Sequence, residues 1–394
     1  MIIGMILDKT FPPDPRVENE AVELIKAGHK VYLFSLHYSE KNDNCNINGI
    51  NVIRYRSNKL EYKLSALAYT VPFYSLLMKR KIYKFIKKYK IEALHIHDIT
   101  IAEAVFNANK HFKLPTVLDL HDNLPENMKF YPHLQKFPGK YIISPKKWKL
   151  KEEEFIKKAT KVITVSQEFV DELLNRVEVK KEKVVLVPNT IRKSFYKDYT
   201  IDQEILNKYK DSFVILYLGD THIRRGLLTA IEAMTKIKKS ILNVKLVIVG
   251  KNTTDPILKK KVEELKLDKF VDFEGWQDVA LFPTYIEVSS ICISPLYRSI
   301  QHDVAYANKL FQYMSLGKPL LVSNATAQKN LIQKINAGVV HKEKDAGDFA
   351  DKIIEMYQKE DMRKAFGEEG KQFVRNHFTW DKTSENLIKL YNNL

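Results

Sequence analysis

The chain is poor in cysteine, with only Cys45 and Cys292 among its 394 residues. The two lie far apart and lack the spacing of metal ligands, so neither a disulfide framework nor a thiolate zinc site is indicated. The sequence also lacks an apolar run near the ~20 residues that a membrane-spanning helix needs. Its start, Met-Ile-Ile-Gly-Met-Ile-Leu-Asp, has no basic flank of the kind that precedes a signal peptide and predicts a buried first strand. These absences predict a soluble, cytoplasmic protein.

Two phosphate-binding motifs are absent as well. No stretch matches G-x-G-x-x-G or G-x-x-x-x-G-K-[ST], so dinucleotide binding and Walker-type nucleotide binding lose support. Acidic residues are under-represented, since 64 lysines and arginines face 48 aspartates and glutamates, for a net charge of +16. Such an excess predicts an anionic partner, which could be nucleic acid, an acidic membrane surface or a phosphorylated substrate.

Short β-branched, apolar runs recur along the chain and alternate with amphipathic stretches, as in parallel α/β sheets. The predicted strands are 1–8, 31–36, 51–55, 92–97, 116–121, 161–166, 183–188, 213–219, 244–250, 271–274, 291–295, 319–323 and 338–341. Because the chain exceeds the ~250 to 300 residues at which single cores usually split, we predict two doubly wound domains. The polar stretch 190–212 separates them, and we place the domains at 1–195 and 196–375, followed by a final helix at about 376–394.

Helix signals mark the first domain's entry. Asp14 suits an N-cap, Pro15 the first helical position and Gly28 a left-handed stop. The loop 9–14 therefore leads from a strand end into a helix, where α/β sheets bind ligands.

The segment 308–319 predicts an anion site. A helix that opens on Asn308 and ends at Gly317 and Pro319 would direct its first amides at an anion, for which a phosphate is the natural guest.

Polar side chains follow two predicted strands, at His95-Ile96-His97-Asp98 and at Leu120-His121-Asp122. Residues two apart in a strand share a face, so His95 and His97 could bind a metal together with a carboxylate. Neutral imidazoles would equally suit hydroxyl groups of a sugar. A third reading is a strand-to-loop junction whose polar groups satisfy one another. The residues leave all three open.

The run 217–226, Tyr-Leu-Gly-Asp-Thr-His-Ile-Arg-Arg-Gly, predicts a strand, a loop and the start of a helix near Leu227. Arg224 and Arg225 at the helix entrance could hold a diphosphate, although paired arginines in such a place are more often solvated surface.

The stretch 72–90 predicts a basic amphipathic helix. The apolar residues Leu76, Leu77, Ile82, Phe85, Ile86 and Tyr89 fall largely on one side, with lysines elsewhere. Docking onto the core is the favoured reading. The nearby Tyr62, Lys63, Tyr69 and Phe73 make contact with anionic lipid the alternative.

Several motifs in order along the chain resemble glycosyltransferase family 4. They are 11–17 (Phe-Pro-Pro-Asp-Pro-Arg-Val), 27–31, His97-Asp98, His121-Asp122, Val165-Ser166, Val187-Pro188-Asn189, 219–226, Val249-Gly250, Gly275-Trp276, 308–319 and 378–381. The last, Phe-Thr-Trp-Asp, resembles the start of the family's final helix, which crosses back onto the first domain.

The resemblance implies a GT-B fold, two Rossmann-like domains facing across a cleft, with a nucleotide-sugar donor on the second and an acceptor on the first. It implies a retaining transferase with no cofactor and no metal, acting on a glycan or lipid-linked acceptor in surface polysaccharide or glycoconjugate biosynthesis. Its catalytic residues would be His121, Arg225 and Asp303. The donor would be bound by Gly219, Asp220, Arg224, Arg225, Gly250, Trp276, Asn308, Lys309, Leu310 and Gln312. The acceptor side would comprise Pro13, Asp14, Arg16, His97, Asp98, Asp122 and Asn189.

The chain departs from the family pattern at the donor site. Asp220 stands where an arginine is usual, and the acid-x7-acid pair becomes Val304 and Gln312, with Asp303 one position away. These changes favour an alternative function, a catalytically weakened GT-B protein that acts as a scaffold in a glycan assembly complex.

Two further classes remain open. The charge suggests a nucleic-acid binder, although no nucleic-acid module is recognised and we expect no specific nucleic acid. The histidine and aspartate cluster suggests a metallohydrolase, which we rank last. Peripheral contact with the inner face of an anionic membrane is the further partner that we consider.

Overall fold

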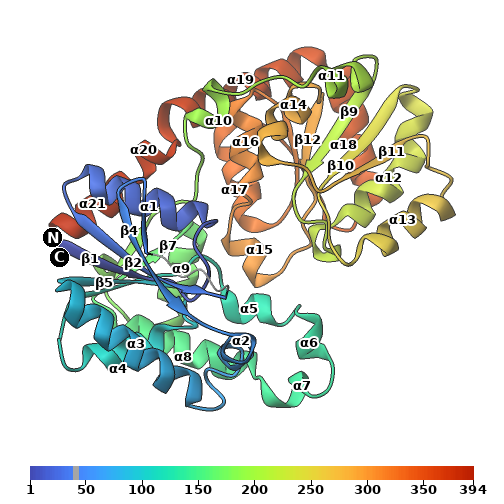
Figure 1. Ribbon diagram of the computed structural model, residues 1–394. Coiled ribbons are helices and arrows are strands. Elements are labelled where there is room, and N and C mark those ends of the chain that lie inside the picture. Colours follow the sequence, from blue (N-terminus) through green and yellow to red (C-terminus); the bar gives the residue numbers. More distant parts are fainter. Residues whose placement is uncertain (39–43) are drawn as a thin grey trace. The chain divides into compact units, whose positions relative to one another are not determined.

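The computed structural model describes residues 1–38 and 44–394 and divides into two compact units (Figure 1). Unit 1 comprises Met1–Asn189 and Thr383–Leu394, and unit 2 comprises Thr190–Lys382. Each is an α/β unit built on one sheet. No helix in the part of the chain that the structure describes is both long and apolar enough to cross a bilayer.

Unit 1 contains an eight-stranded sheet with the strand order β3-β4-β2-β1-β5-β6-β7-β8. The strands are β1 (Ile2–Ile6), β2 (Lys30–His37), β3 (Cys45–Ile47), β4 (Ile50–Arg56), β5 (Ala93–His97), β6 (Thr116–Asp119), β7 (Lys161–Thr164) and β8 (Val184–Leu186). All neighbours pair in parallel except β3 and β4. The prediction of a parallel, doubly wound sheet is confirmed for this unit.

The helices of unit 1 connect these strands. They are α1 (Pro15–Lys26), α2 (Lys59–Ser65), α3 (Phe73–Tyr89), α4 (Ala102–Asn109), α5 (Leu124–Met128), α6 (Pro132–Gln135), α7 (Gly139–Ile142), α8 (Pro145–Lys158), α9 (Gln167–Arg176), the 3-10 turn η1 (Lys181–Lys183) and the C-terminal α21 (Glu385–Asn392).

Strand β3 was not predicted. It is a short, partly polar strand that forms an antiparallel hairpin with β4 through Asn48 and Gly49, both with positive φ. An Asn-Gly pair between two extended segments is the signal for a two-residue hairpin turn and could have located it.

The predicted helix signals of α1 are present. The Asp14 side chain accepts a hydrogen bond from the amide of Val17, Pro15 occupies the first turn, and Gly28 has φ +89°. Helix α3 docks on the core as expected: the predicted Ile82, Phe85 and Ile86 are buried, and Tyr74 and Met78 join them. Leu76, predicted on the docked side, is exposed, because in the first turns of the helix the buried side passes through Tyr74 and Met78 instead.

Unit 2 contains a six-stranded sheet with the order β11-β10-β9-β12-β13-β14, parallel throughout. Its strands are β9 (Phe213–Leu218), β10 (Val244–Val249), β11 (Val271–Gly275), β12 (Ile291–Ser294), β13 (Leu320–Ser323) and β14 (Gly338–His341). Its helices are α10 (Ser194–Lys197), α11 (Gln203–Tyr209), η2 (Ile223–Arg225), α12 (Leu227–Ser240), α13 (Asp255–Glu264), η3 (Val279–Leu281), α14 (Phe282–Glu287), α15 (Ile300–Val304), α16 (Lys309–Ser315), α17 (Thr326–Ile335), α18 (Ala346–Gln358), α19 (Glu360–His377) and α20 (Trp380–Thr383).

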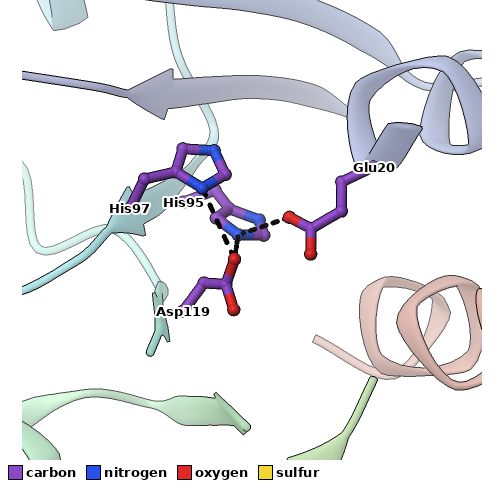
Figure 2. Close-up of side chains that lie close together, drawn as sticks. All are labelled: Glu20, His95, His97 and Asp119. Carbon is purple, nitrogen blue, oxygen red and sulfur yellow. Dashed lines mark ion pairs between the residues drawn. The ribbon is translucent and has the colours of Figure 1, made fainter. Parts of the chain in front are cut away.

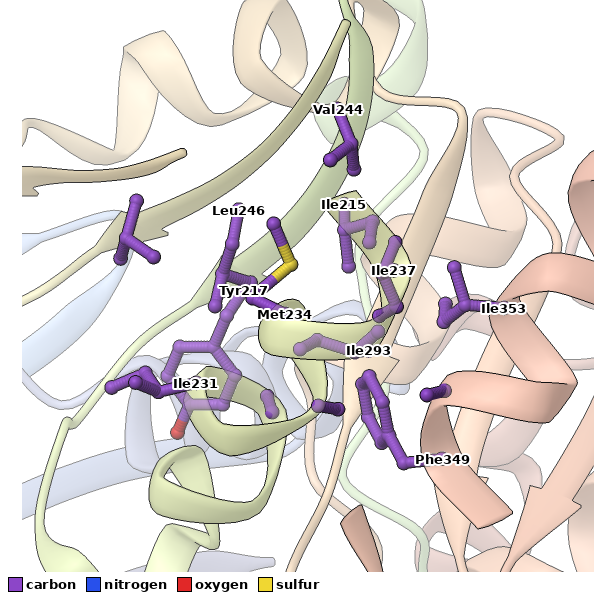
Figure 3. Packing of buried hydrophobic residues seen from close by; sticks show 14 of the residues in the cluster. Ile215, Tyr217, Ile231, Met234, Ile237, Val244, Leu246, Ile293, Phe349 and Ile353 are labelled. Atoms are coloured by element: carbon purple, nitrogen blue, oxygen red, sulfur yellow. The ribbon is translucent and has the colours of Figure 1, made fainter. Parts of the chain in front are cut away.

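Helices cover the sheet of unit 2 and bury apolar side chains against it. On one face, Ile215, Tyr217 and Leu246 of the sheet pack with Met234 and Ile237 of α12, and α18 adds Phe349 and Ile353 (Figure 3). Burial of large apolar side chains of this kind stabilises a fold by about 1.5 to 3 kcal/mol each. The packed face holds the strand ends of unit 2 in fixed positions.

The division between the units lies at 189/190, not at 195/196. Ile191 forms a parallel bridge with Thr379, and Tyr196 is buried in the core of unit 2, so the start of the polar stretch belongs to unit 2. At the other end, the chain returns to unit 1 at Thr383, because α19 and α20 are still part of unit 2 up to Lys382.

Two glycines at the ends of the neighbouring strands β10 and β11 allow a matched test of the backbone geometry. Both Gly250 (φ +146°) and Gly275 (φ +69°) have positive φ, but a Cβ at Gly250 would lie 1.9 Å from the carbonyl oxygen of Gly219, and none of the surrounding atoms lies within 4 Å of a Cβ at Gly275. We expect Gly275→Ala to lower the free energy of unfolding by about 1 kcal/mol, the cost of left-handed backbone. Gly250→Ala should cost at least about 3 kcal/mol because backbone must move. Urea denaturation measures both, and equal losses would contradict the assigned geometry.

Candidate functional site

In unit 1, predicted site residues meet at the carboxyl ends of β5 and β6. His97 is the last residue of β5 and Asp98 follows it, while His121 stands two residues beyond the end of β6. Asp98 has φ +62°, and its carboxylate accepts a hydrogen bond from the backbone amide of His121. Nδ1 of His97 lies 3.1 Å from Nε2 of His121. The expected proximity of these side chains is thus present.

Asp119, the last residue of β6, is the centre of this group. Its fully buried carboxylate accepts hydrogen bonds from Nε and Nη2 of Arg16, at 3.0 and 2.7 Å, and lies 2.8 Å from Nε2 of His121. Arg16 also donates to the carbonyl of Val187 and pairs with Glu20. Arg16, predicted on the acceptor side, therefore has its guanidinium directed into the unit.

Glu20, His95, His97 and Asp119 form a compact buried group (Figure 2), whose potential ligand atoms lie within 4.8 Å of one another. Such a set could hold a metal ion. Arg16, however, already binds the carboxylates of both Glu20 and Asp119. A fixed guanidinium supplies the positive charge that a cation would otherwise bring, so the donor set suits ion pairing better than metal binding.

The C-terminal segment completes the group. The hydroxyl of Tyr391 in α21 lies 2.9 Å from Nδ1 of His95, and Nε2 of His95 lies 3.2 Å from Glu20. The last helix of the chain thereby belongs structurally to the buried cluster of unit 1.

The charges of the cluster follow from its contacts. Burial lowers the pKa of His121, but Asp98 and Asp119 outweigh burial and raise it to about 9. Burial and the neighbouring His95 lower the pKa of His97. Although burial opposes it, Arg16 holds the pKa of Asp119 well below its usual range. At neutral pH the cluster thus contains a charged His121 and an ionised Asp119.

The remaining predicted residues of unit 1 have less central places. Pro13 and Asp122 are exposed, and Asp14 caps α1. Asn189 is half-buried at the point where the chain leaves unit 1.

In unit 2, the loop after β9 gathers most of the predicted donor residues. Gly219 has φ +111°, and the carboxylate of Asp220 accepts hydrogen bonds from Nε of Arg225 at 3.2 Å and from the side chain of Asn252 at 2.6 Å. Burial acts to raise the pKa of Asp220, but the charge of Arg225 and the hydrogen bond from Asn252 outweigh burial and lower it. Asp220 therefore pairs with the arginine predicted to hold the diphosphate. Arg224 contacts the neighbouring backbone, its carbonyl accepting from Tyr297.

Helix α16 starts where it was predicted. Asn308 is the N-cap residue, although its side chain does not accept a capping hydrogen bond, and the helix ends before Gly317, which has φ +73°. The amide of Leu310 donates to the carbonyl of Ala307, so it is not free for a phosphate. The side-chain amide of Gln312 is half-buried and has no hydrogen-bond partner within residues 1–38 and 44–394.

Lys309 has an unusual environment. Its Nζ is buried without a hydrogen-bond partner in the described chain and lies 3.4 Å from the centre of the Tyr217 ring. A Cβ on Gly219 would lie 3.6 Å from the same nitrogen, so the amine adjoins the Gly219 loop. Burial, and then the charge of Arg225, hold the pKa of Lys309 well below its usual range, against the effect of Asp220. The amine is thus a hydrogen-bonding group without a partner beside that loop.

Two further predicted residues have other surroundings. Trp276 follows β11 and is largely exposed. Asp303 binds Arg298 through both carboxylate oxygens and accepts from the backbone amide and the hydroxyl of Thr326. Asp303 therefore acts as a cap at the start of α17, and Val304 beside it is buried.

Sequence reasoning missed several residues of these clusters, notably Asp119, Glu20 and Asn252. Asp119 ends the run Val-Leu-Asp, which reads as a buried strand, and an acid there is itself the signal of a functional or paired group. Glu20 stands four residues after Arg16 on α1, a spacing that places both on one helix face. The sequence offers no comparable signal for Asn252.

Comparison with known families finds two models that follow one another along the chain. Residues 16–195 match "Glycosyltransferase Family 4", and residues 198–373 match "Glycosyl transferases group 1". The two matches lie within unit 1 and unit 2 almost entirely, and together they span nearly the whole chain.

Among curated proteins, the chain is 23% identical over 253 residues to the capsular polysaccharide biosynthesis glycosyltransferase CapM of Staphylococcus aureus, covering 59% of this chain and 62% of that one. It is 23% identical over 235 residues to the alpha-monoglucosyldiacylglycerol synthase of Acholeplasma laidlawii, covering 56% of each. The chain thus spans about half to three fifths of the length of the first such relatives.

Solved structures share the whole fold. A sucrose-phosphate synthase from Thermosynechococcus elongatus superposes with a TM-score of 0.80 at 17% identity, over 100% of this chain and 98% of that one. HepE from Anabaena, in complex with UDP-glucose, superposes with a TM-score of 0.72 at 13% identity, over 100% of both chains. Such low identity carries the fold and no more.

The raised pKa of His121 predicts how stability depends on pH. Its folded pKa of about 9 exceeds the ordinary 6.5, so protonated His121 stabilises the fold below pH 6.5, and this contribution is lost as pH rises toward 9. At its fullest it amounts to about 3 kcal/mol. Wild type and His121→Gln should therefore differ most in free energy of unfolding on the acid side of this window and converge above it. A difference that does not change with pH would contradict the imidazolium.

The unpartnered amine of Lys309 predicts a gain of stability on its removal. Methionine has a similar length and no polar group, so Lys309→Met should raise the free energy of unfolding by about 1 to 3 kcal/mol. Lys318 is the matched control, because this half-buried lysine of unit 2 donates to the carbonyl of Glu287 at 2.8 Å. Lys318→Met should leave stability unchanged or lower it. Chemical denaturation of both variants measures these changes. A loss of stability in Lys309→Met would contradict the description of the Lys309 amine as buried and without a partner.

Proposed function

Since the chain belongs to the glycosyltransferases of family 4 and has the GT-B fold, we propose that it is a retaining transferase of a nucleotide-sugar's glycosyl group. The acceptor would be a glycan or a lipid-linked glycan in the synthesis of surface polysaccharide or glycoconjugate. The observation that supports this most directly is the set of groups at the carboxyl end of β9, where Arg225 and the buried amine of Lys309 adjoin the loop that starts at Gly219.

The donor site would lie on unit 2. A nucleoside diphosphate carries charge on its phosphates, and Arg225 can hold phosphate oxygens in a planar, two-pronged contact. Lys309 would supply a second donor, and the unpartnered amide of Gln312 could bind the hydroxyls of the ribose. HepE, a protein of the same fold, was solved with UDP-glucose, which makes a nucleotide-sugar the first class of ligand to test.

Catalysis would depend on charge and orientation rather than on a base. A nucleoside diphosphate is a good leaving group, so the main need is to stabilise the charge that develops on it as the glycosyl bond breaks. We propose that Arg225 supplies this positive charge and that the amine of Lys309 donates a hydrogen bond to a phosphate oxygen. Because the guanidinium of Arg225 can take the role of a divalent ion, we propose that transfer needs no metal and no cofactor.

The acceptor is proposed from the relatives. CapM acts in capsular polysaccharide biosynthesis, and the second relative synthesises a glucosyl diacylglycerol, so both a growing glycan and a lipid are reasonable acceptor classes for this chain. A lipid-linked acceptor would require a cytoplasmic protein that contacts the membrane peripherally.

A second candidate function is a scaffold without transfer activity. The pairing of Arg225 with Asp220 favours it, because an arginine that is already bound to a carboxylate must give up that contact to hold a phosphate. The donor-binding experiment separates the two functions.

We expect a calorimetric screen of nucleoside diphosphates and their sugar conjugates to identify one selectively bound donor. Arg225→Ala should weaken its binding by at least about tenfold, since charge-assisted hydrogen bonds contribute roughly 1.5 to 3 kcal/mol. Gln312→Ala should weaken binding of the whole nucleotide but not of a free pyrophosphate. The anomeric configuration of the product, read by NMR with an acceptor preparation, then reports on retention.

Lys260→Ala is the control, because Lys260 is an exposed cation on α13 of the same unit. It should leave donor affinity unchanged. Binding of none of the conjugates by a folded protein would reject the transferase and favour the scaffold.

A further inference from the structure

Unit 1 exposes large apolar side chains on segments that follow one another around one part of the fold. Phe137 and Tyr141 are 84% and 77% exposed, and they belong to the connection that contains α7. Helix α2 and the start of α3 add more. We call this set the aromatic face: Leu60, Tyr62, Phe73, Phe137, Tyr141 and Ile142. Exposed aromatic and aliphatic side chains at this density, on neighbouring segments, mark an interaction surface rather than ordinary scatter.

Contacts join the segments that carry the aromatic face. The hydroxyl of Thr70, in the turn between α2 and α3, donates to the carbonyl of Ile142 at 2.9 Å. The rings of Tyr69 and Trp148 meet edge to face at 4.6 Å, which connects the same turn to α8. In Figure 1, α2, α7 and α8 lie at the lower edge of unit 1. The exposed side chains therefore sit on one continuous part of the surface.

The charge on these segments is mainly positive, and Glu61 of α2, between Leu60 and Tyr62, pairs with Lys81. Residues 62–91 include eight lysines and arginines and no acidic residue, and residues 127–151 include seven lysines and again no acidic residue. Lys140, Lys146 and Lys147 are exposed and make no ion pair within the part of the chain that the structure describes. Exposed rings are thus interspersed with lysines, of which Lys81, Lys129, Lys149 and Lys151 pair with acids of the described chain and Lys140, Lys146 and Lys147 do not.

This combination selects the partner. Lysines alone would suit any polyanion, but a nucleic acid offers no apolar phase for Leu60 and Ile142. A bilayer with anionic headgroups offers both, because lysines meet the negative surface while aromatic and aliphatic side chains enter the interface. We propose that the aromatic face docks unit 1 onto an anionic membrane surface.

The position of the face fits the proposed chemistry, on which this inference rests. The hydroxyl of Tyr69 donates to the carbonyl of Ile99, next to Asp98 at the carboxyl end of β5. The chain that follows His121 passes through α5 and α6 to the aromatic face. A docked face would bring lipid headgroups to the strand ends that hold the histidine cluster, where a lipid-linked acceptor is needed.

Vesicle flotation of the full-length protein tests the proposal. One set of vesicles is phosphatidylcholine alone, and the other is phosphatidylcholine and phosphatidylglycerol in equal parts. We expect binding to the anionic vesicles only, weakened by salt. Phe137→Ser with Tyr141→Ser should reduce it at least about tenfold, because two interfacial side chains are lost. Lys140→Glu with Lys146→Glu and Lys147→Glu should reduce it further, since each basic residue near the surface contributes about a fivefold factor.

Matched controls carry the same changes in unit 2. Leu242 and Ile257 are exposed apolar residues there, and Leu242→Ser with Ile257→Ser should leave flotation unchanged. Lys260→Glu with Lys334→Glu and Lys364→Glu reverses the same number of charges in unit 2, and flotation should persist. Equal binding to both vesicle types, or face variants that float as well as wild type, would overturn the proposal, as would tighter binding to RNA that the face variants retain.

The outcome is separable from that of the proposed transferase. Donor binding is measured in the same variants by calorimetry, and the aromatic-face changes should not alter it. Flotation that depends on the face without binding of any donor would support the membrane surface and reject the transferase. Donor binding without flotation would support the transferase and reject the membrane surface.

Discussion

The buried carboxylate of Asp119 is the interaction on which unit 1 depends. It lies fully buried at the end of β6 and binds Arg16 of α1 and His121 of the following loop. Arg16 in turn reaches the carbonyl of Val187 beyond β8. One ion pair therefore joins a helix, two strand ends and the loop that carries the candidate catalytic histidine. Breaking such a buried pair from one side costs about 3 to 5 kcal/mol, so this part of the fold is held strongly.

The candidate site of unit 2 differs from this cluster, because its polar groups are only partly paired within the protein. The site must accept charge from outside, so its cations cannot all be neutralised within the protein. Among the residues that the structure describes, Arg225 pairs with Asp220, which also binds Asn252, and the amine of Lys309 has no hydrogen-bond partner. Burying an amine without a hydrogen-bond partner lowers the stability of the fold, and a bound phosphate could offset this loss by accepting a hydrogen bond. Buried polar groups of this kind are typical of binding sites, where stability is exchanged for function.

Much of this arrangement follows from local patterns, and the exceptions have physical reasons. The parallel strands, the punctuation of α1 and the limits of α16 are set by residues close in sequence, so the sequence predicts them well. The roles of Asp303 and Arg16 are not local. Asp303 seemed a candidate for the donor sugar, yet it caps α17 through Thr326, some twenty residues away. Arg16 seemed to face an acceptor, yet its guanidinium turns inward to an acid that the sequence places in an ordinary strand.

The positions of the basic residues in the fold say more about the anionic partner than the net charge does. A net charge of +16 cannot by itself distinguish a nucleic acid, a phosphorylated substrate and a membrane. The fold separates the charges into two kinds of place. A few cations stand at strand ends in unit 2, beside a glycine loop and partly buried, where a small anion fits. Many others lie on the outside of unit 1 between exposed rings, where only a large, partly apolar surface could meet them together. Two anionic partners of different size, as proposed above, would therefore explain the charge better than one.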